Sequence, residues 1–379
     1  MTETMMNTLY CCYYQTIQAS FRSRIDDLIS QFSNKENIIS LTFFGTTNDV
    51  RYFAELAVIK AAINSYFSSE SPLITYVAQP LQTADEMAVE VTYLKDDKAS
   101  TTVQYKSLHN VRYALWEFDK TRFLMVEGVC GDNFTDSVEQ QANVAFRKIE
   151  SILSSENIPI QNIVRQWNYI GRITEMTDHC QNYQAFNDAR AHFYEKTFWK
   201  HGYPAATGIG MCCNGVVVSL IAVASSASTQ IIPIDNPLQI PAFAYSVDQL
   251  IGESKTPKLT PKFERAKVVQ TESGTICFVS GTAAIRGEKS MAEVDAAQQT
   301  QQTIENIERL ISTENLNRQD VACKSGLNIT NLRVYLKHWE DIEAIRQVVD
   351  KHWKGRPAVY LQADICRKEL LLEIEAIAT

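Results

Sequence analysis

The chain ends in Pro357-Ala358-Val359 and then Leu372-Glu373-Ile374-Glu375-Ala376-Ile377-Ala378, which close the second of two long segments that repeat one another. Pro204-Ala205-Ala206 is the counterpart of the first of these stretches. Upstream, Val126-Glu127-Gly128-Val129 matches Val279-Ser280-Gly281-Thr282, and a Gln-rich stretch follows in both copies. An internal repeat of this length indicates the architecture before any single motif does.

A third, partial copy precedes these two. Ser71-Pro72-Leu73 parallels Arg356-Pro357-Ala358, and Val89-Glu90-Val91-Thr92 stands in the place of the last strand. The first half of this copy, up to about Ser40, is degenerate. Three units in a chain of 379 residues give about 126 residues each, a normal size for a small α/β layer pair.

Each unit has the pattern of strands alternating with helices. Thr275–Ser280 is rich in β-branched and aromatic residues and ends at Gly281, which is typical of a strand. Apolar residues between Val294 and Ile311 recur at helical spacing, which predicts a helix with one buried face. We therefore predict an α/β (α+β) fold with the following divisions: a degenerate N-terminal unit over 1–125, a second unit over 126–224, a Pro-rich insertion over 225–270 and a C-terminal unit over 271–379.

The predicted insertion contains Ser225–Thr229 and five prolines. Proline and serine in this density are typical of loops. Long loops of this kind either cover a functional cleft or connect elements at the surface. Both interpretations stay open for this segment.

Composition disfavours several classes of protein. No apolar run approaches the ~18–20 residues of a membrane span, and the first residues lack the pattern of a secretory signal. Nine cysteines in no framework spacing favour reduced thiols, so we expect a cytoplasmic protein that contacts no membrane. A net charge of −8 disfavours a nucleic-acid partner. Phosphate-loop, dinucleotide and zinc-protease motifs are absent from the sequence, and we expect neither a metal nor a cofactor.

The repeated pattern that ends in Pro-Ala and Glu-Ile-Glu-Ala-Ile-Ala resembles the RidA/YjgF family. Proteins of that family assemble as trimers with sites between neighbouring subunits. The resemblance therefore implies repeated RidA/YjgF-like (chorismate mutase-like) units in a pseudo-trimeric arrangement within one chain. In the imine-deaminating members, an arginine that holds the substrate carboxylate follows the Pro-Ala. Ala206 and Val359 occupy that place here.

A second resemblance covers most of the chain beyond about Val126 and rests on seven blocks in order. The blocks are Trp167-Asn168-Tyr169-Ile170, Tyr183–Arg190, Pro204–Gly210, Asn236-Pro237-Leu238-Gln239, Phe263-Glu264-Arg265-Ala266, Ser280–Ile285 and Asp364-Ile365-Cys366-Arg367. Together they resemble the chorismatase family. Four residues depart from that family's pattern: Arg286, Glu288, Phe243 and Ala244.

The chorismatase resemblance implies hydrolysis of the enolpyruvyl ether of chorismate, a small dicarboxylate, to pyruvate plus 3-hydroxybenzoate or a dihydroxycyclohexadiene carboxylate. Protonating an enol ether needs an acid that is still neutral at pH 7, which a buried carboxyl group provides. The resemblance places Glu373 in this role. Glu375, either a second donor or a surface carboxylate, is the next candidate. Cys366 is the predicted catalytic residue beside the ring.

Two substrate carboxylates call for guanidinium partners, because a guanidinium fork binds a carboxylate through two hydrogen bonds. The predicted substrate-binding residues are Tyr169, Arg190, Tyr245, Arg265, Ala283 and Arg346, with Arg367 as one more arginine. Three alternatives stay open: a RidA-like imine or enamine hydrolase, a non-catalytic carboxylate-binding protein, and pyruvate elimination to 4-hydroxybenzoate. The chain is expected to be a monomer or a small homo-oligomer.

Overall fold

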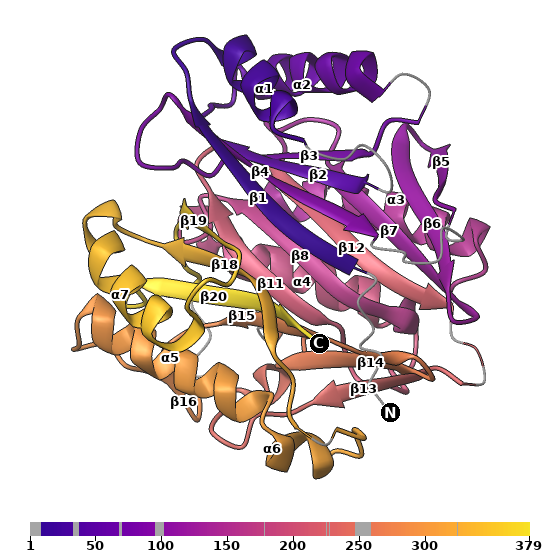
Figure 1. Cartoon of the computed structure of the whole chain (residues 1–379), viewed down its shortest axis with the longest axis vertical. Coiled ribbons are helices and arrows are strands. Elements are labelled where there is room, and N and C mark those ends of the chain that lie inside the picture. Colours follow the sequence, from indigo (N-terminus) through magenta and orange to yellow (C-terminus); the bar gives the residue numbers. More distant parts are fainter. Residues whose placement is uncertain are drawn as a thin grey trace.

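The computed structural model describes residues 9–32, 38–67, 70–94, 102–177, 179–224, 226, 228–246, 259–323 and 325–379. Within these ranges the chain forms three main sheets, and helices cover one face of each (Figure 1). No helix of the described ranges is both long enough and apolar enough to cross a membrane.

The first sheet has four strands in the order β1-β4-β2-β3. β2 and β3 run parallel, whereas β4 runs antiparallel to both β2 and β1. Helices α1 and α2 lie over its outer face (Figure 1). The elements are β1 Leu9–Ile17, α1 Phe21–Ser30, β2 Ile38–Gly45, α2 Tyr52–Phe67, β3 Leu73–Val77 and β4 Glu86–Leu94.

The second sheet has six strands in the order β11-β8-β12-β7-β6-β5, with α3 and α4 packed on one face. Helix α3 begins with a capping box in which Ser137 and Gln140 satisfy each other's backbone groups. This part of the chain also holds a separate two-stranded sheet of β9 and β10. Its elements in chain order are β5 Gln104–Leu108, β6 Val111–Phe118, β7 Thr121–Cys130, α3 Val138–Ser155, β8 Ile163–Gly171, β9 Met176–Thr177, β10 Cys180–Gln181, α4 Asn182–Tyr194, β11 Ala205–Met211 and β12 Val216–Ala224.

The third sheet also has six strands, in the order β13-β14-β15-β20-β18-β19, and α5 and α7 cover its outer face (Figure 1). Asp295 and Gln298 form the same capping box at α5 that begins α3. This part of the chain also holds a separate two-stranded sheet of β16 and β17. Its elements in chain order are β13 Gln230–Ile234, β14 Ala266–Thr271, β15 Gly274–Thr282, β16 Ile285–Arg286, β17 Lys289–Ser290, α5 Ala296–Leu310, α6 Thr313–Asn317, β18 Ile329–Leu336, α7 Ile342–Trp353, β19 Ala358–Gln362 and β20 Leu372–Ala378.

The three sheets share a four-strand core of one topology. In each, a central strand pairs in parallel with an edge strand and antiparallel with the next strand in the sheet. Pro72, Pro204 and Pro357 each directly precede that edge strand, where the missing N–H costs no ladder hydrogen bond. The α/β (α+β) fold of repeated units is thus confirmed. The three-fold relation among the units stays a prediction.

Strand pairing differs from the predicted unit boundaries in two places. Residues 104–118, assigned to the first unit, form the hairpin β5–β6 and pair with β7 of the second sheet. Residues 230–234 and 266–270, assigned to the insertion, form β13 and nearly all of β14, and these strands extend the third sheet beyond β15. Pro233 is tolerated because β13 is an edge strand. Residues 247–258 of the predicted insertion lie outside the described residues.

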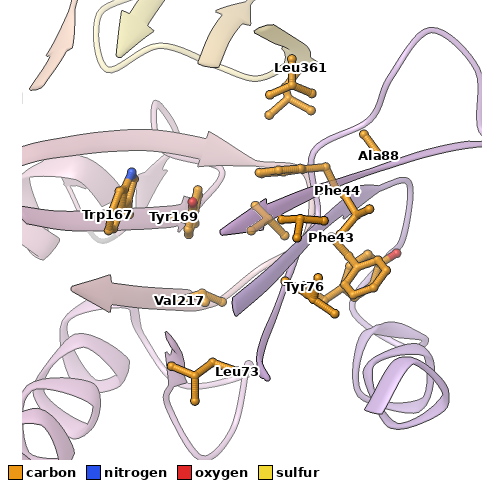
Figure 2. Close-up of a cluster of buried hydrophobic side chains, with 14 of the residues drawn as sticks. Phe43, Phe44, Leu73, Tyr76, Ala88, Trp167, Tyr169, Val217 and Leu361 are labelled. Carbon is orange, nitrogen blue, oxygen red and sulfur yellow. The ribbon is translucent and has the colours of Figure 1, made fainter. Parts of the chain in front are cut away.

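The inner faces of the three sheets meet in one apolar core. Figure 2 shows Phe44 of the first sheet, Trp167 and Tyr169 of the second and Leu361 of the third gathered in this region. Every residue of β8 is buried, because α4 covers one face of this strand and the inner core covers the other. Polar side chains that project into such a core must find protein partners.

Candidate active site

A pocket lies between the second and third sheets. Residues of α4 and β11 line one side, residues of β15 and β20 line the other, and the segment that leads into β14 covers it. The lining residues are Gln181, Tyr183, Gln184, Asn187, Arg190, Ala206, Gly208, Tyr245, Pro261, Phe263, Arg265, Gly281, Ala283, Ile285, Cys366, Arg367, Leu370 and Glu373.

Glu373 is a buried carboxyl group in the wall of this pocket, and only 5% of its surface is exposed. Burial and, to a lesser degree, the negative charge of Glu375 raise its pKa, Arg165 and Arg265 act in the opposite direction, and the net result is a pKa of about 8. At pH 7 the group is therefore mainly the neutral acid. A neutral carboxylic acid that faces a pocket can donate a proton to a bound ligand.

The Glu373 carboxyl group lies directly against Gly281. A Cβ atom at position 281 would lie only 1.9 Å from Glu373 Oε1, so any side chain there would displace the carboxyl group. We expect Gly281→Ala to lower turnover by about 10²-fold, because a misplacement of about 1 Å at a reacting group has an effect of that size. Steady-state kinetics on the folded variant checks this result, and unchanged turnover would contradict the close contact.

Two arginines of the pocket are buried, and neither has a carboxylate partner in the described part of the chain. Arg190 is 1% exposed, and its Nη2 donates to Asn187 Oδ1 at 2.6 Å. Arg265 is 4% exposed, and its Nη2 donates to the Ile240 carbonyl and the Tyr245 hydroxyl, each at 2.6 Å. Within the described part of the chain, the Nε atom of each arginine has no hydrogen-bond partner, and no carboxylate pairs with either. Buried guanidinium groups without a counter-ion favour an anionic ligand.

The pocket also brings together three other residues predicted from the sequence. Tyr245 is half-buried and its ring lies 5.5 Å from the Arg265 guanidinium carbon. Ala283 follows β15 and is buried. Burial raises the pKa of Cys366 to about 12, so this group is a neutral thiol at pH 7 rather than a thiolate nucleophile or base.

Two predicted substrate-binding residues lie outside the pocket. Tyr169 points into the inner core, where its hydroxyl accepts a hydrogen bond from Arg333 Nη1 at 2.6 Å. Arg346 is on α7, where its guanidinium lies 4.8 Å from the Tyr360 ring and its side chain is 44% exposed. We therefore withdraw both residues as substrate contacts.

Glu375 is not the surface carboxylate that the sequence pattern allowed. It is 5% exposed and lies behind the pocket, in contact with two arginines. Arg165 Nη2 lies 2.8 Å from its Oε2 atom, and Arg333 Nη1 lies 3.3 Å from its Oε1 atom. These partners come from the second and third sheets, which sequence spacing alone does not bring together.

The four residues that depart from the chorismatase pattern have local roles. Arg286 pairs with Glu305 at 2.8 Å, and Glu288 accepts hydrogen bonds from the Ser246 backbone and hydroxyl. Phe243 packs its ring against Tyr203, and Ala244 ends the short helix η2 (Ala242–Ala244). None of the four is among the residues that line the pocket.

Tyr183 and Asn187 line the pocket but were not singled out from the sequence, unlike Arg190 on the same helix. Tyr183, Asn187 and Arg190 lie four and three residues apart on α4, so one helix face presents all three to the pocket. Polar residues at this helical spacing in an otherwise buried helix are the sequence pattern that could have identified the pocket-lining face of α4. Arg367, a weaker candidate, also lines the pocket and donates to the Glu288 carbonyl and to Ser290.

Comparison with protein families gives two matches. Residues 98–222 match the family described as chorismatase FkbO/Hyg5-like, N-terminal. Residues 259–379 match the Endoribonuclease L-PSP family, which is the RidA type. These two stretches of the chain are therefore similar to a chorismatase N-terminal domain and to an L-PSP domain. Both resemblances seen in the sequence are thereby confirmed.

Individual relatives agree with the family matches. A 3-hydroxybenzoate synthase of Streptomyces hygroscopicus is 32% identical over 230 residues, which cover 59% of this chain and 65% of that protein. A chorismatase of Streptomyces rapamycinicus is 31% identical over 223 residues, which cover 57% of this chain and 64% of that protein. The chain thus spans slightly less than two thirds of the length of these relatives.

The fold of the chain is similar to that of a solved chorismatase. A chorismatase crystal structure at 1.08 Å resolution superposes with a TM-score of 0.74 and covers 98% of this chain and 99% of its own. The two sequences are 23% identical, so this likeness concerns the fold.

Proposed function

We propose that this chain is a chorismatase-type enzyme, a hydrolase or lyase that cleaves the enolpyruvyl ether of chorismate and releases pyruvate. The observation that carries the proposal is the composition of one buried pocket. Glu373 supplies a neutral acid there, and Arg190 and Arg265 supply guanidinium groups that no carboxylate of the described residues pairs with. The family matches support the same substrate class.

In the proposed reaction, Arg190 and Arg265 bind the two substrate carboxylates, and Glu373 donates its proton to the terminal methylene carbon of the enol ether. The resulting oxocarbenium ion adds water, which returns a proton to Glu373. The hemiketal then breaks its C–O bond to give pyruvate and the ring alcohol. Each step moves a proton or adds water, so the reaction calls for no redox cofactor.

We propose 3-hydroxybenzoate as the ring product. The conversion of chorismate to 3-hydroxybenzoate and pyruvate consumes no net water. One water is added at the ether, and one is lost when the ring becomes aromatic. Cys366 and Ala283 line the pocket, and the Cys366 thiol is neutral, which suits a contact with an uncharged ring better than a role as a base. A dihydroxycyclohexadiene carboxylate is the product if aromatisation does not occur.

Incubation with chorismate, followed by a pyruvate assay and chromatography of the ring product, tests the proposal. We expect pyruvate and 3-hydroxybenzoate in equal amounts. Chorismate binding without pyruvate release would instead favour a carboxylate-binding protein, and ammonia release from imino acids would favour a RidA-like deaminase. A diol or 4-hydroxybenzoate would keep the substrate and change the product assignment.

A further inference from the structure

Behind the wall of the pocket lies a buried cluster of charged residues contributed by all three sheets. Glu90 comes from β4, Glu127 from β7, Arg165 from β8, Arg333 from β18 and Glu375 from β20. Arg333 binds both oxygens of Glu90, at 2.8 and 2.5 Å, which fixes this guanidinium between the first and third sheets. The proposed reaction uses none of these five side chains.

Glu375 is the member of this cluster that approaches the pocket. Its Oε2 atom accepts from Arg165 Nη2 at 2.8 Å and from the Thr207 hydroxyl at 2.5 Å. Its Oε1 atom accepts from Trp167 Nε1 at 2.8 Å. Two guanidinium groups and two neutral donors hold this group as a carboxylate anion at one fixed position.

Thr207 connects this carboxylate to the wall of the pocket. The Thr207 oxygen also accepts hydrogen bonds from Arg165 Nη2 at 2.6 Å and from the Gly281 backbone N–H at 3.1 Å. Gly281 is the residue against which the Glu373 carboxyl group lies. A continuous chain of contacts therefore runs from Glu375 through Thr207 and Gly281 to Glu373.

The charge of Glu375 acts on Glu373 as well. Both residues are on β20, two positions apart, and both are 5% exposed. A negative charge in a poorly solvated environment disfavours a second negative charge beside it. The other charged or titratable groups that face Glu373 come from separate elements: Arg165 from β8, Tyr183 from α4, Arg265 from the segment before β14, and Cys366 from the segment before β20.

We propose that Glu375, held by Arg165 and Thr207, is a positioning residue that keeps the Glu373 carboxyl group neutral and fixed against Gly281. The inference rests on the proposed function for its catalytic meaning, because a neutral Glu373 matters most if it donates a proton. Glu375 itself does not donate, since its carboxylate is occupied by cationic partners on the far side of the wall.

The variant Glu375→Gln tests this proposal, because glutamine keeps the shape of the side chain and removes its negative charge. Without the neighbouring negative charge, and with Arg165 left unpaired, Glu373 should ionise at lower pH. The decline of kcat/KM on the alkaline side, expected near pH 8 in the wild type, should move down by about one pH unit or more while KM at acidic pH changes little. Glu314→Gln on the exposed surface is the matched control and should leave the profile in place.

A second measurement does not depend on turnover. Protein labelled with carbon-13 at the glutamate carboxyl carbons shows the ionisation of Glu373 directly, once its signal is assigned by its loss in Glu373→Gln. We expect the titration midpoint of this signal to fall in Glu375→Gln and to stay unchanged in Glu314→Gln. If the wild type releases no pyruvate, the proposed function fails, yet this titration still decides the role of Glu375. An unchanged midpoint in Glu375→Gln overturns the inference.

Glu375→Gln removes the carboxylate partner of the buried Arg165, whereas Arg333 keeps Glu90. If the variant does not fold, a pair of variants at Thr207 replaces it. Thr207→Val keeps the shape and removes the hydroxyl, whereas Thr207→Ser keeps the hydroxyl. We expect Thr207→Val to lower kcat by at least about tenfold and Thr207→Ser to retain most of it. Equal kcat values in the two variants contradict the connection through Thr207.

Discussion

Glu373→Gln is expected to lower the rate of pyruvate release from chorismate by about 10²–10⁴-fold while leaving the dissociation constant of chorismate close to that of the wild type. The amide keeps the shape of the side chain and its place against Gly281, but it has no proton to give to the enol ether. Single-turnover kinetics and equilibrium binding measure the two quantities separately. Near-wild-type pyruvate release by this variant would rule out Glu373 as the proton donor.

The role of Glu373 as proton donor also predicts in which direction the turnover of the wild type changes with pH. Glu373 has to be protonated to act, so turnover is expected to fall as the pH rises through about 8, and the residual rate of Glu373→Gln should lack this decline. Glu314→Gln is the control for a glutamate replaced at the surface, and its profile should match the wild type.

The folding stability of Glu373→Gln shows whether a slower reaction comes from the missing proton donor or from unfolding of the variant. Because burial raises the pKa of Glu373 above its unfolded value of 4.5, the folded state binds this proton more tightly than the unfolded state. The resulting stabilisation is fully present below pH 4.5 and is lost as the pH rises through about 8. Glutamine does not ionise, so the variant should show no such loss at alkaline pH, and its melting temperature there should not be lower than that of the wild type.

The repeat predicted the fold well because it depends on local signals. The prolines before the edge strands and the Gln-rich helices with their capping residues recur in register, and each marks an element by its own chemistry. The unit boundaries were less accurate. We assigned the β5–β6 hairpin to the first unit and β13–β14 to the insertion, whereas they extend the second and third sheets. The sequence of a strand at the edge of a sheet does not indicate which strand it pairs with.

The candidate site was predicted only in part, and the physical reason differs among its residues. Glu373 and Arg265 have side-chain types that the proposed reaction calls for, and both line the pocket. Tyr169 was misplaced because β8 is buried on both faces, so alternation along this strand does not tell which face meets the pocket. Arg346 was misplaced because the charge of an arginine predicts a partner but not its position, and here it stacks on Tyr360.

Glu375 illustrates the limit of sequence reasoning most directly. Two carboxylates spaced two apart on an apolar strand have the pattern of a half-exposed sheet face. The partners that make burial of Glu375 acceptable, Arg165 and Arg333, lie in different units of the chain, and only the packing of the sheets brings them together.

Arg265→Ala and Arg190→Ala are each expected to weaken chorismate binding by about 2–5 kcal/mol, which is about 30-fold to several thousand-fold in the dissociation constant. The effect is large because both guanidinium groups are buried and lack a carboxylate partner among the described residues, so a bound carboxylate meets a charge that water does not screen. Equilibrium titration with chorismate under conditions that prevent turnover, for instance in the Glu373→Gln background, gives the dissociation constants.

Arg346→Ala is the matched control, because it removes the same side chain from a position outside the pocket and should leave binding unchanged. The melting temperature of the protein without chorismate tests separately whether the buried Arg190 charge serves binding rather than stability. Among the described residues, Asn187 and the Phe186 ring 5.6 Å away offset the desolvation of the buried Arg190 charge, so Arg190→Met should bind chorismate weakly without losing melting temperature. Unchanged dissociation constants in both alanine variants would mean that the substrate carboxylates bind elsewhere, with Arg367 as the remaining guanidinium of the pocket.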